Sequence, residues 1–226
     1  MDLNQKALSL WNEGKASEAL ETLFKAIDEE PNKKEGYYNL VSLLIAAKKF
    51  ADAKAVLDTA GEKFPEEESF LYAYGNWHYQ QNNYTNALDS YVQVFGKPDS
   101  FFKGEAAAMI GQCYLALQQP KLALAYLLEA EVHHPKDTTI LLMLGNSLLQ
   151  TESFLDAERY FGKVIALDEK SAEAWFKKGL ALRARQQDPE EVKVCLQKAK
   201  QLDPEKFLTY AQQLKEIESV VTKKED

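Results

Sequence analysis

Residues 138–168 read TTILLMLGNSLLQTESFLDAERYFGKVIALD, and this stretch contains two helical patterns in succession. Its apolar and small residues recur every three or four positions, first at Leu141, Leu144, Gly145 and Leu148, then at Phe154, Ala157, Phe161 and Val164. This spacing places the side chains on one face of an α-helix. The stretch therefore predicts two amphipathic helices joined by a short turn.

The same pattern returns along the chain with a period of about 34 residues. Alanines recur at Ala19, Ala53, Ala87, Ala123 and Ala157, with gaps of 34, 34, 36 and 34 residues. Glycines recur at Gly75, Gly111, Gly145 and Gly179, with gaps of 36, 34 and 34 residues. Both rows contain a surplus of two residues at the same place, so one insertion within residues 94–103 explains both. A fixed period of this length predicts a stacked array of repeats.

The residues after each alanine predict the buried face of a second helix. They are Leu23, Leu57, Tyr91, Leu127 and Phe161, four residues on, and Ala26, Ala60, Val94, Ala130 and Val164, seven residues on. Pro31, Pro65 and Pro135 follow and mark the helix ends.

A glycine inside a helix costs about 1 kcal/mol relative to alanine. We therefore expect the glycine row to mark a close approach of the partner helix's backbone. In the sixth unit one extra residue is expected in the turn 186–189.

These positions resemble the tetratricopeptide repeat (TPR) family. The residues that carry the likeness are Tyr37, Leu40, Phe50, Ala53, Ala60 and Pro65, then Gly111, Tyr114, Ala123, Ala130 and Pro135, and finally Trp175, Gly179, Ala199 and Pro204. The resemblance implies an all-α fold, an α-solenoid of antiparallel helix pairs forming a right-handed superhelix. It predicts a single solenoid over residues 1–221, with repeats at about 1–33, 34–67, 68–103, 104–137, 138–171 and 172–204. Residues 205–221 are predicted to form a capping helix or, alternatively, a dimerisation helix, and 222–226 a charged tail.

The resemblance also implies a concave groove lined by the first helix of each pair. The groove residues expected to contact a partner are Tyr38, Asn39, Tyr72, Asn76, Tyr79, Met109, Gln112, Leu142, Met143, Asn146, Phe176, Lys177 and Arg183. Asn76, Gln112 and Asn146 would form a ladder of side-chain amides, which can pair with the N–H and C=O groups of an extended peptide. Alanine at Asn76 and Asn146 is expected to leave melting nearly unchanged. The alternative for any one residue is packing between adjacent repeats.

Several classes of function are disfavoured by the composition. The formal net charge of -8 lacks the positive footprint that nucleic acid requires. Cys113 and Cys195 have no ligand partners at metal spacing, and we expect no cofactor; Cys195 is expected near the surface. No signal peptide or membrane span is recognisable, so we expect a cytoplasmic protein. The positions of the family's carboxylate clamp lack cations, which disfavours a co-chaperone role.

The sequence thus favours a non-catalytic scaffold or adaptor that binds a peptide segment or a partner helix in the groove. The alternative is a peptide-responsive regulatory sensor without its own DNA-binding domain. An enzyme is disfavoured because no paired acid and base or activated nucleophile is recognisable. We expect a monomer or weak homodimer, and the sequence leaves the partner's identity open.

Overall fold

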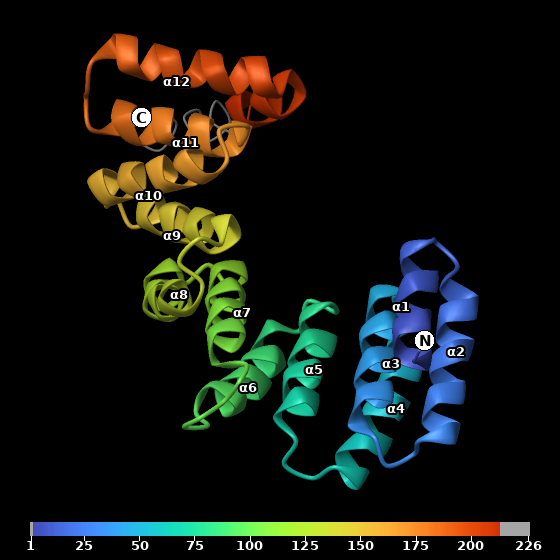
Figure 1. Ribbon diagram of the computed structural model, residues 1–226. Helices are drawn as coiled ribbons and strands as arrows, with labels where there is room; N and C mark the ends of the chain where they lie inside the picture. Colours follow the sequence, from blue (N-terminus) through green and yellow to red (C-terminus); the bar gives the residue numbers. More distant parts are fainter. Residues whose placement is uncertain (1, 213–226) are drawn as a thin grey trace. The chain divides into compact units, whose positions relative to one another are not determined.

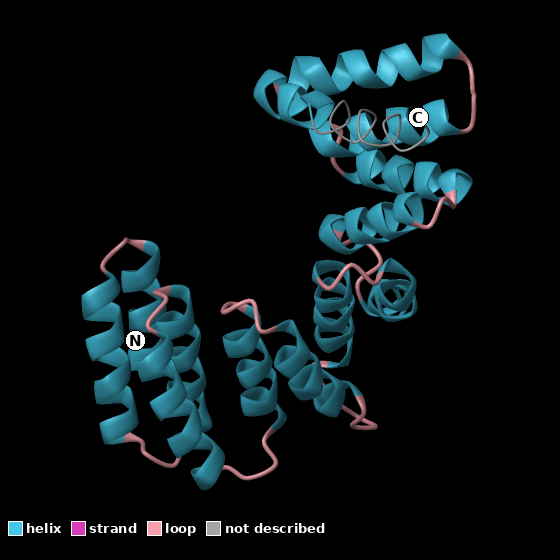
Figure 2. Ribbon diagram, turned by 180° about the vertical axis from the view of Figure 1, so that it is seen from behind, coloured by secondary structure: helices cyan, strands magenta, loops and turns pink. Residues whose placement is uncertain are grey.

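The computed structural model describes residues 2–212 of the 226-residue chain. Residues 213–221 of the predicted capping helix and the predicted tail 222–226 lie outside the described residues. The chain divides into two compact units, Met1–Leu117 and Gln118–Asp226, and each is described by itself. All regular structure in the described part is helical, with short turns and no strand (Figure 2), so the all-α prediction is confirmed.

The first unit consists of helices that pack consecutively (Figure 1). They are α1 Leu3–Asn12, α2 Ala16–Glu29, α3 Lys34–Ala46, α4 Phe50–Lys63, α5 Glu68–Tyr79, α6 Tyr84–Phe95 and α7 Lys103–Ala116. The first helices of successive pairs also meet, because α1 contacts α3 and α3 contacts α5. These helices therefore share one side of the unit.

The second unit repeats this arrangement. Its helices are α8 Pro120–His133, α9 Thr138–Gln150, α10 Phe154–Leu167, α11 Ala172–Ala184 and α12 Pro189–Leu202. Residues 204–212 are also helical, up to the end of the described part. Consecutive helices again pack together, and the first helices α9 and α11 contact each other.

The predicted alanine row and the rows that follow it form the core. Ala19, Ala53, Ala87, Ala123 and Ala157 are fully buried, as are Leu23, Leu57, Tyr91, Leu127 and Phe161. A small alanine lets the two helices of a pair approach closely, and the larger side chain one turn later fills the space beside it. The buried face predicted for the second helices is confirmed.

Gly75 and Gly145 make room for aromatic rings. A Cβ atom on Gly75 would lie 2.4 Å from Cε1 of Tyr91, and one on Gly145 would lie 2.6 Å from Cε1 of Phe161. The expected approach of the partner helix is therefore real, but it is made by a ring and not by the backbone. The sequence prediction was wrong on this point because the residue four after each alanine is large enough to fill the gap.

One turn residue in each helix pair has a left-handed backbone. Gly14 has a φ of 79°, and the non-glycine residues at the equivalent places have φ values from 54° to 61°. Those residues are Lys48, Asn82, Gln118, Glu152 and Gln186. Their spacing follows the repeat period, so each helix pair reverses direction through the same backbone conformation.

Two irregularities in the repeat are located by the helix ends. The connection between α6 and α7 covers residues 96–102, whereas the equivalent connection before α5 covers 64–67. The predicted insertion therefore lies between α6 and α7. Helix α12 begins at Pro189, three residues after Gln186, whereas α10 begins two residues after Glu152. This confirms the extra residue in the last turn.

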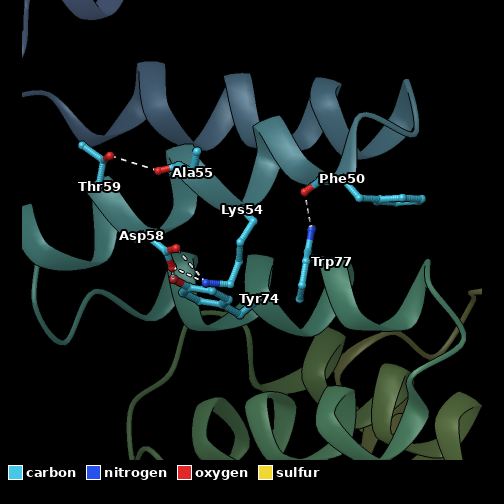
Figure 3. Close-up of polar contacts among 7 residues, drawn as sticks. All are labelled: Phe50, Lys54, Ala55, Asp58, Thr59, Tyr74 and Trp77. Atoms are coloured by element: carbon cyan, nitrogen blue, oxygen red, sulfur yellow. Dashed lines mark hydrogen bonds and ion pairs between the residues drawn. The ribbon is translucent and has the colours of Figure 1, made fainter.

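Polar contacts fix α5 against α4 (Figure 3). The Tyr74 hydroxyl on α5 donates a hydrogen bond of 2.6 Å to Oδ1 of Asp58 on α4, and Nζ of Lys54 lies 2.6 Å from the same oxygen. Hydrogen bonds from Lys54 and Tyr74 lower the pKa of Asp58. Nε1 of Trp77 donates to the carbonyl oxygen of Phe50 at 2.8 Å. The contacts hold the helix that carries Asn76 and Tyr79.

Candidate functional site

A hollow of about 480 Å³ lies among α3, α5 and α7, the first helices of three successive pairs. The residues that line it are Ser42, Ile45, Ala46, Lys48, Ala73, Asn76, Tyr79, Gln80, Met109 and Gln112. It brings together four of the predicted groove residues, Asn76, Tyr79, Met109 and Gln112. Lys48 is the one charged residue among those lining it, so the hollow presents mainly amide, aromatic and thioether groups.

Asn76 is held by a hydrogen bond from the core. The buried Tyr91 hydroxyl donates to its Oδ1 at 2.7 Å. Burial raises the pKa of Tyr91 well above its ordinary value, so the phenol stays a neutral donor. The Nδ2 group of Asn76 donates no hydrogen bond within residues 2–212. The bond fixes the orientation of one amide that lines the hollow.

Gln112 differs from Asn76 because it makes no side-chain hydrogen bond within the described part of the chain. It is half-buried on α7, beside Met109 in the lining of the hollow. Its carboxamide offers both a donor and an acceptor. Among the predicted amides, Gln112 is therefore the side chain whose removal disturbs the fold least.

Tyr38 and Tyr72 lie with Phe102 in an aromatic cluster. The rings of Tyr72 and Phe102 are stacked, with centroids 5.1 Å apart and planes at 14°, and the Tyr38 and Phe102 centroids are 6.5 Å apart. Burial raises the pKa of both tyrosines, so their hydroxyls stay neutral. Tyr38 and Tyr72 do not line the hollow itself. They form a second surface of the first unit.

Asn39 bonds to the preceding repeat. Its Nδ2 donates to Oδ1 of Asn4 at 3.1 Å, and Asn4 is only 5% exposed. This amide pair joins α1 to α3. Asn39 therefore has a packing contact, the alternative that the sequence left open for single groove residues.

In the second unit, Asn146 and Lys177 contact each other. Nζ of Lys177 donates to Oδ1 of Asn146 at 2.7 Å and to Oε1 of Glu173 at 2.7 Å. The Asn146 oxygen is therefore already paired, as is that of Asn76. The predicted ladder of amides is in part a set of intrachain hydrogen bonds, which the spacing of the residues did not reveal.

The remaining predicted residues of the second unit have different environments. Phe176 is only 4% exposed, because Phe207 and Tyr210 pack against its ring with centroids 5.6 and 5.1 Å away. Leu142 packs against the buried clusters around Leu141 and Phe161. Met143 is half-buried, and Arg183 is exposed on α11. Phe176 and Leu142 thus serve packing in this structure.

Some residues at the site were not singled out from the sequence. Lys48 and Gln80 line the hollow from the turns after α3 and α5, where the helix pattern carries no information. Phe102 was missed because it lies in the connection between α6 and α7. An adjacent pair of phenylalanines within the insertion was the available signal.

The two cysteines are both buried free thiols. Burial raises the pKa of Cys113 to about 12 and also raises that of Cys195. The expectation that Cys195 lies near the surface was wrong, because its Cβ packs beside Gly179 between α11 and α12. Within residues 2–212, no three His, Cys, Asp or Glu side chains form a group suited to a metal ion.

Two segments of the chain, residues 10–74 and 142–205, match sequence profiles described as tetratricopeptide repeat, and together they span more than half of it. The chain belongs to the tetratricopeptide repeat family, and this membership supports a protein-interaction scaffold. No curated protein sequence matches it.

Solved structures resemble the chain over most of its length. YrrB, described as a TPR protein with an unusual peptide-binding site, is 26% identical, with a TM-score of 0.69 and coverage of 84% of this chain and 97% of YrrB. PilF of Pseudomonas aeruginosa is 15% identical, with a TM-score of 0.80 and coverage of 93% and 96%. PilW, described as a type IV pilus biogenesis factor, is 16% identical, with a TM-score of 0.77 and coverage of 89% and 92%. The last two similarities concern the fold alone.

Across the described residues, no helix is both long and apolar enough to span a bilayer.

Proposed function

We propose that this chain is a non-catalytic scaffold that binds an extended peptide segment of a partner protein in the hollow among α3, α5 and α7. The observation that carries the proposal is the convergence of Asn76, Tyr79, Met109 and Gln112 on one hollow of about 480 Å³. These four residues lie on α5 and α7, and Ser42 and Ile45 on α3 complete the lining, so a bound segment would cross three repeats. The peptide-binding site described for YrrB supports the same kind of ligand.

The side chains of the hollow are suited to hydrogen bonds with a peptide backbone, and only one of them, Lys48, could pair with a charged group. Gln112 can pair with one N–H and one C=O group, and the free Nδ2 group of Asn76 can donate to a second carbonyl. Tyr79 offers a large apolar surface with few rotatable bonds, and Met109 adapts its shape to the ligand. Lys48 supplies one cation at the rim. The hollow therefore favours an extended segment with apolar side chains.

A peptide-display selection on the full chain, followed by calorimetric titration of the selected peptides, tests the proposal. The double variant Gln112→Ala and Met109→Ala should weaken binding by about tenfold or more, the loss expected when one hydrogen bond and one apolar contact are removed. The melting temperature of the single variant Gln112→Ala should stay close to that of the wild type, since the Gln112 side chain makes no hydrogen bond within residues 2–212.

Gln93→Ala is the matched control. Gln93 is exposed on the second helix α6 and lies outside the residues lining the hollow. Binding should be unchanged in this variant. Equal affinity for the wild type and the double variant would contradict the hollow as the binding site.

A further inference from the structure

The connection between α6 and α7 carries two adjacent phenylalanines with very different environments. Phe101 is 82% exposed, whereas Phe102 is half-buried against α3 and α5. This connection is the part of the chain that the two-residue insertion lengthens. Phe102 therefore occupies its place because of a departure from the regular repeat.

Phe102 covers the two tyrosines that the sequence assigned to a binding groove. Its ring stacks on Tyr72 with centroids 5.1 Å apart, the offset arrangement that aromatic pairs favour, and it also contacts Tyr38 on the preceding first helix. We call Tyr38 and Tyr72 the aromatic subsite. The two tyrosine rings thus form a surface on which a third aromatic ring, that of Phe102, is packed.

The equivalent aromatic residue of the second unit is covered in the same way. Phe176 is in register with Tyr38 and Tyr72 in the repeat, and Phe207 and Tyr210 pack against it. Both units therefore place an aromatic side chain of the chain itself on this row. In both units, an aromatic residue of this row therefore accepts a second aromatic ring against it.

The connection of residues 96–102, which contains Phe102, is attached to the rest of the unit partly by surface hydrogen bonds. Nζ of Lys97 donates to the carbonyl oxygen of Glu66 at 2.7 Å, and the Phe101 N–H donates to Oε1 of Glu68 at 3.0 Å. Both hydrogen bonds are exposed, and exposed polar contacts contribute little to stability. A connection held in this way opens at a lower free energy than the helices beneath it.

We propose that the aromatic subsite binds an aromatic side chain of a peptide partner, and that Phe102 occupies it in the free protein as an exchangeable competitor. The proposal rests on the function assigned to the neighbouring hollow. Tyr72 contacts Tyr91 with ring centroids 5.4 Å apart, and Tyr91 donates to Asn76 in the hollow. One peptide can therefore reach both places.

The test uses the chain's own segment as the probe. An acetylated and amidated peptide with the sequence of residues 96–103, GKPDSFFK, is titrated calorimetrically into the full chain and into its Phe102→Ala variant. The variant should bind it at least about tenfold more tightly, because in the wild type the tethered Phe102 competes at a high effective concentration. A peptide with alanine in place of its second phenylalanine should not bind either protein.

Control variants separate this proposal from other effects. Phe101→Ala removes the exposed ring and should behave as the wild type does. Tyr72→Ala combined with Phe102→Ala should lose the binding gained by the single variant. Gln93→Ala, outside both the hollow and the aromatic subsite, should leave GKPDSFFK binding unchanged. The hollow is tested with the selected peptides and not with GKPDSFFK, so failure of the hollow and failure of the aromatic subsite give different results.

A second variant guards against misfolding of Phe102→Ala. Lys97→Ala with Glu68→Ala weakens both contacts of the segment and leaves Phe102 in place, and it should bind the peptide with an affinity between those of the other two proteins. Equal affinity of the peptide for the wild type and the folded variants, or no binding to any of them, would overturn the proposal.

Discussion

Asn76 has two roles, since it lines the hollow and its Oδ1 accepts a hydrogen bond from the hydroxyl of the buried Tyr91. Asn76→Ala would leave that hydroxyl without its partner in the core, which costs about 1–3 kcal/mol. We therefore expect the variant to lower the free energy of unfolding by this amount, measured by urea denaturation. This replaces the sequence-based expectation of nearly unchanged melting.

Tyr91→Phe in the same background provides the control, because it removes the unpaired hydroxyl. The double variant should be more stable than Asn76→Ala alone. Asn146→Ala should cost little, since its partner Lys177 is partly exposed and keeps its ion pair with Glu173. Equal losses in the free energy of unfolding for Asn76→Ala and Asn146→Ala would show that the hydrogen bond from Tyr91 to Asn76 does not stabilise the core.

Gly145 offers a second test of packing at single-residue resolution. A Cβ atom there would lie 2.6 Å from the ring of the fully buried Phe161, so Gly145→Ala should destabilise the protein by about 1–3 kcal/mol through overpacking. Gly162 on the adjacent helix α10 is the matched control, since a Cβ atom added to it would meet nothing within 4 Å. Gly162→Ala should raise the free energy of unfolding by up to about 1 kcal/mol through helix propensity. Thermal and urea denaturation of the two variants should shift in opposite directions.

The turns between paired helices contain backbone strain, because each turn needs one residue with a positive φ. Five of them place a non-glycine residue in the left-handed region, where a Cβ atom is disfavoured. Gly14→Ala should therefore lower the free energy of unfolding by about 1 kcal/mol, and Glu152→Gly should raise it by up to about the same amount. Urea denaturation measures both changes. Shifts of the same sign in the two variants would contradict the assignment of strain to the turns.

The helices could be predicted from the sequence because their buried faces repeat at local spacings. Ala157 and Phe161, for example, belong to one helix and define its inner face without knowledge of the fold. The hydrogen-bond partners of the site could not be predicted in this way. Tyr91 reaches Asn76 across a helix pair, and Lys177 reaches Asn146 across a repeat, so these contacts depend on side-chain geometry between elements.

Segments outside the repeat pattern escaped prediction for a related reason. The insertion could be located from the spacing of Ala87 and Ala123, but the spacing says nothing about where an inserted side chain packs. Phe102 lies over Tyr72, and the connection that carries it forms hydrogen bonds to Glu66 and Glu68. The same irregularity that interrupts the repeat thus shapes the candidate binding surface.

At the scale of the molecule, the net charge and the residues lining the hollow both favour the proposed peptide partner over a nucleic acid. A formal charge of -8 disfavours phosphate backbones, and the hollow contributes one cation, Lys48, toward a ligand. The proposed binding to the hollow would therefore depend on hydrogen bonds and apolar contact more than on long-range attraction. Its affinity should respond only weakly to salt, because screening acts chiefly on exposed charges.

The contacts between helices also determine how a local change spreads through the chain. Within each unit, helices contact mainly the next helix and the equivalent helix of the neighbouring repeat, so stability is approximately a sum of repeats and their interfaces. Gly145→Ala should therefore speed amide hydrogen exchange in α9, α10 and α11 while leaving α1, α2 and α3 nearly unchanged. Exchange followed by mass spectrometry, with Gly162→Ala as the control, resolves the two groups of helices. An equal increase at both ends would mean that the chain unfolds as one cooperative structure and that its repeats do not respond separately.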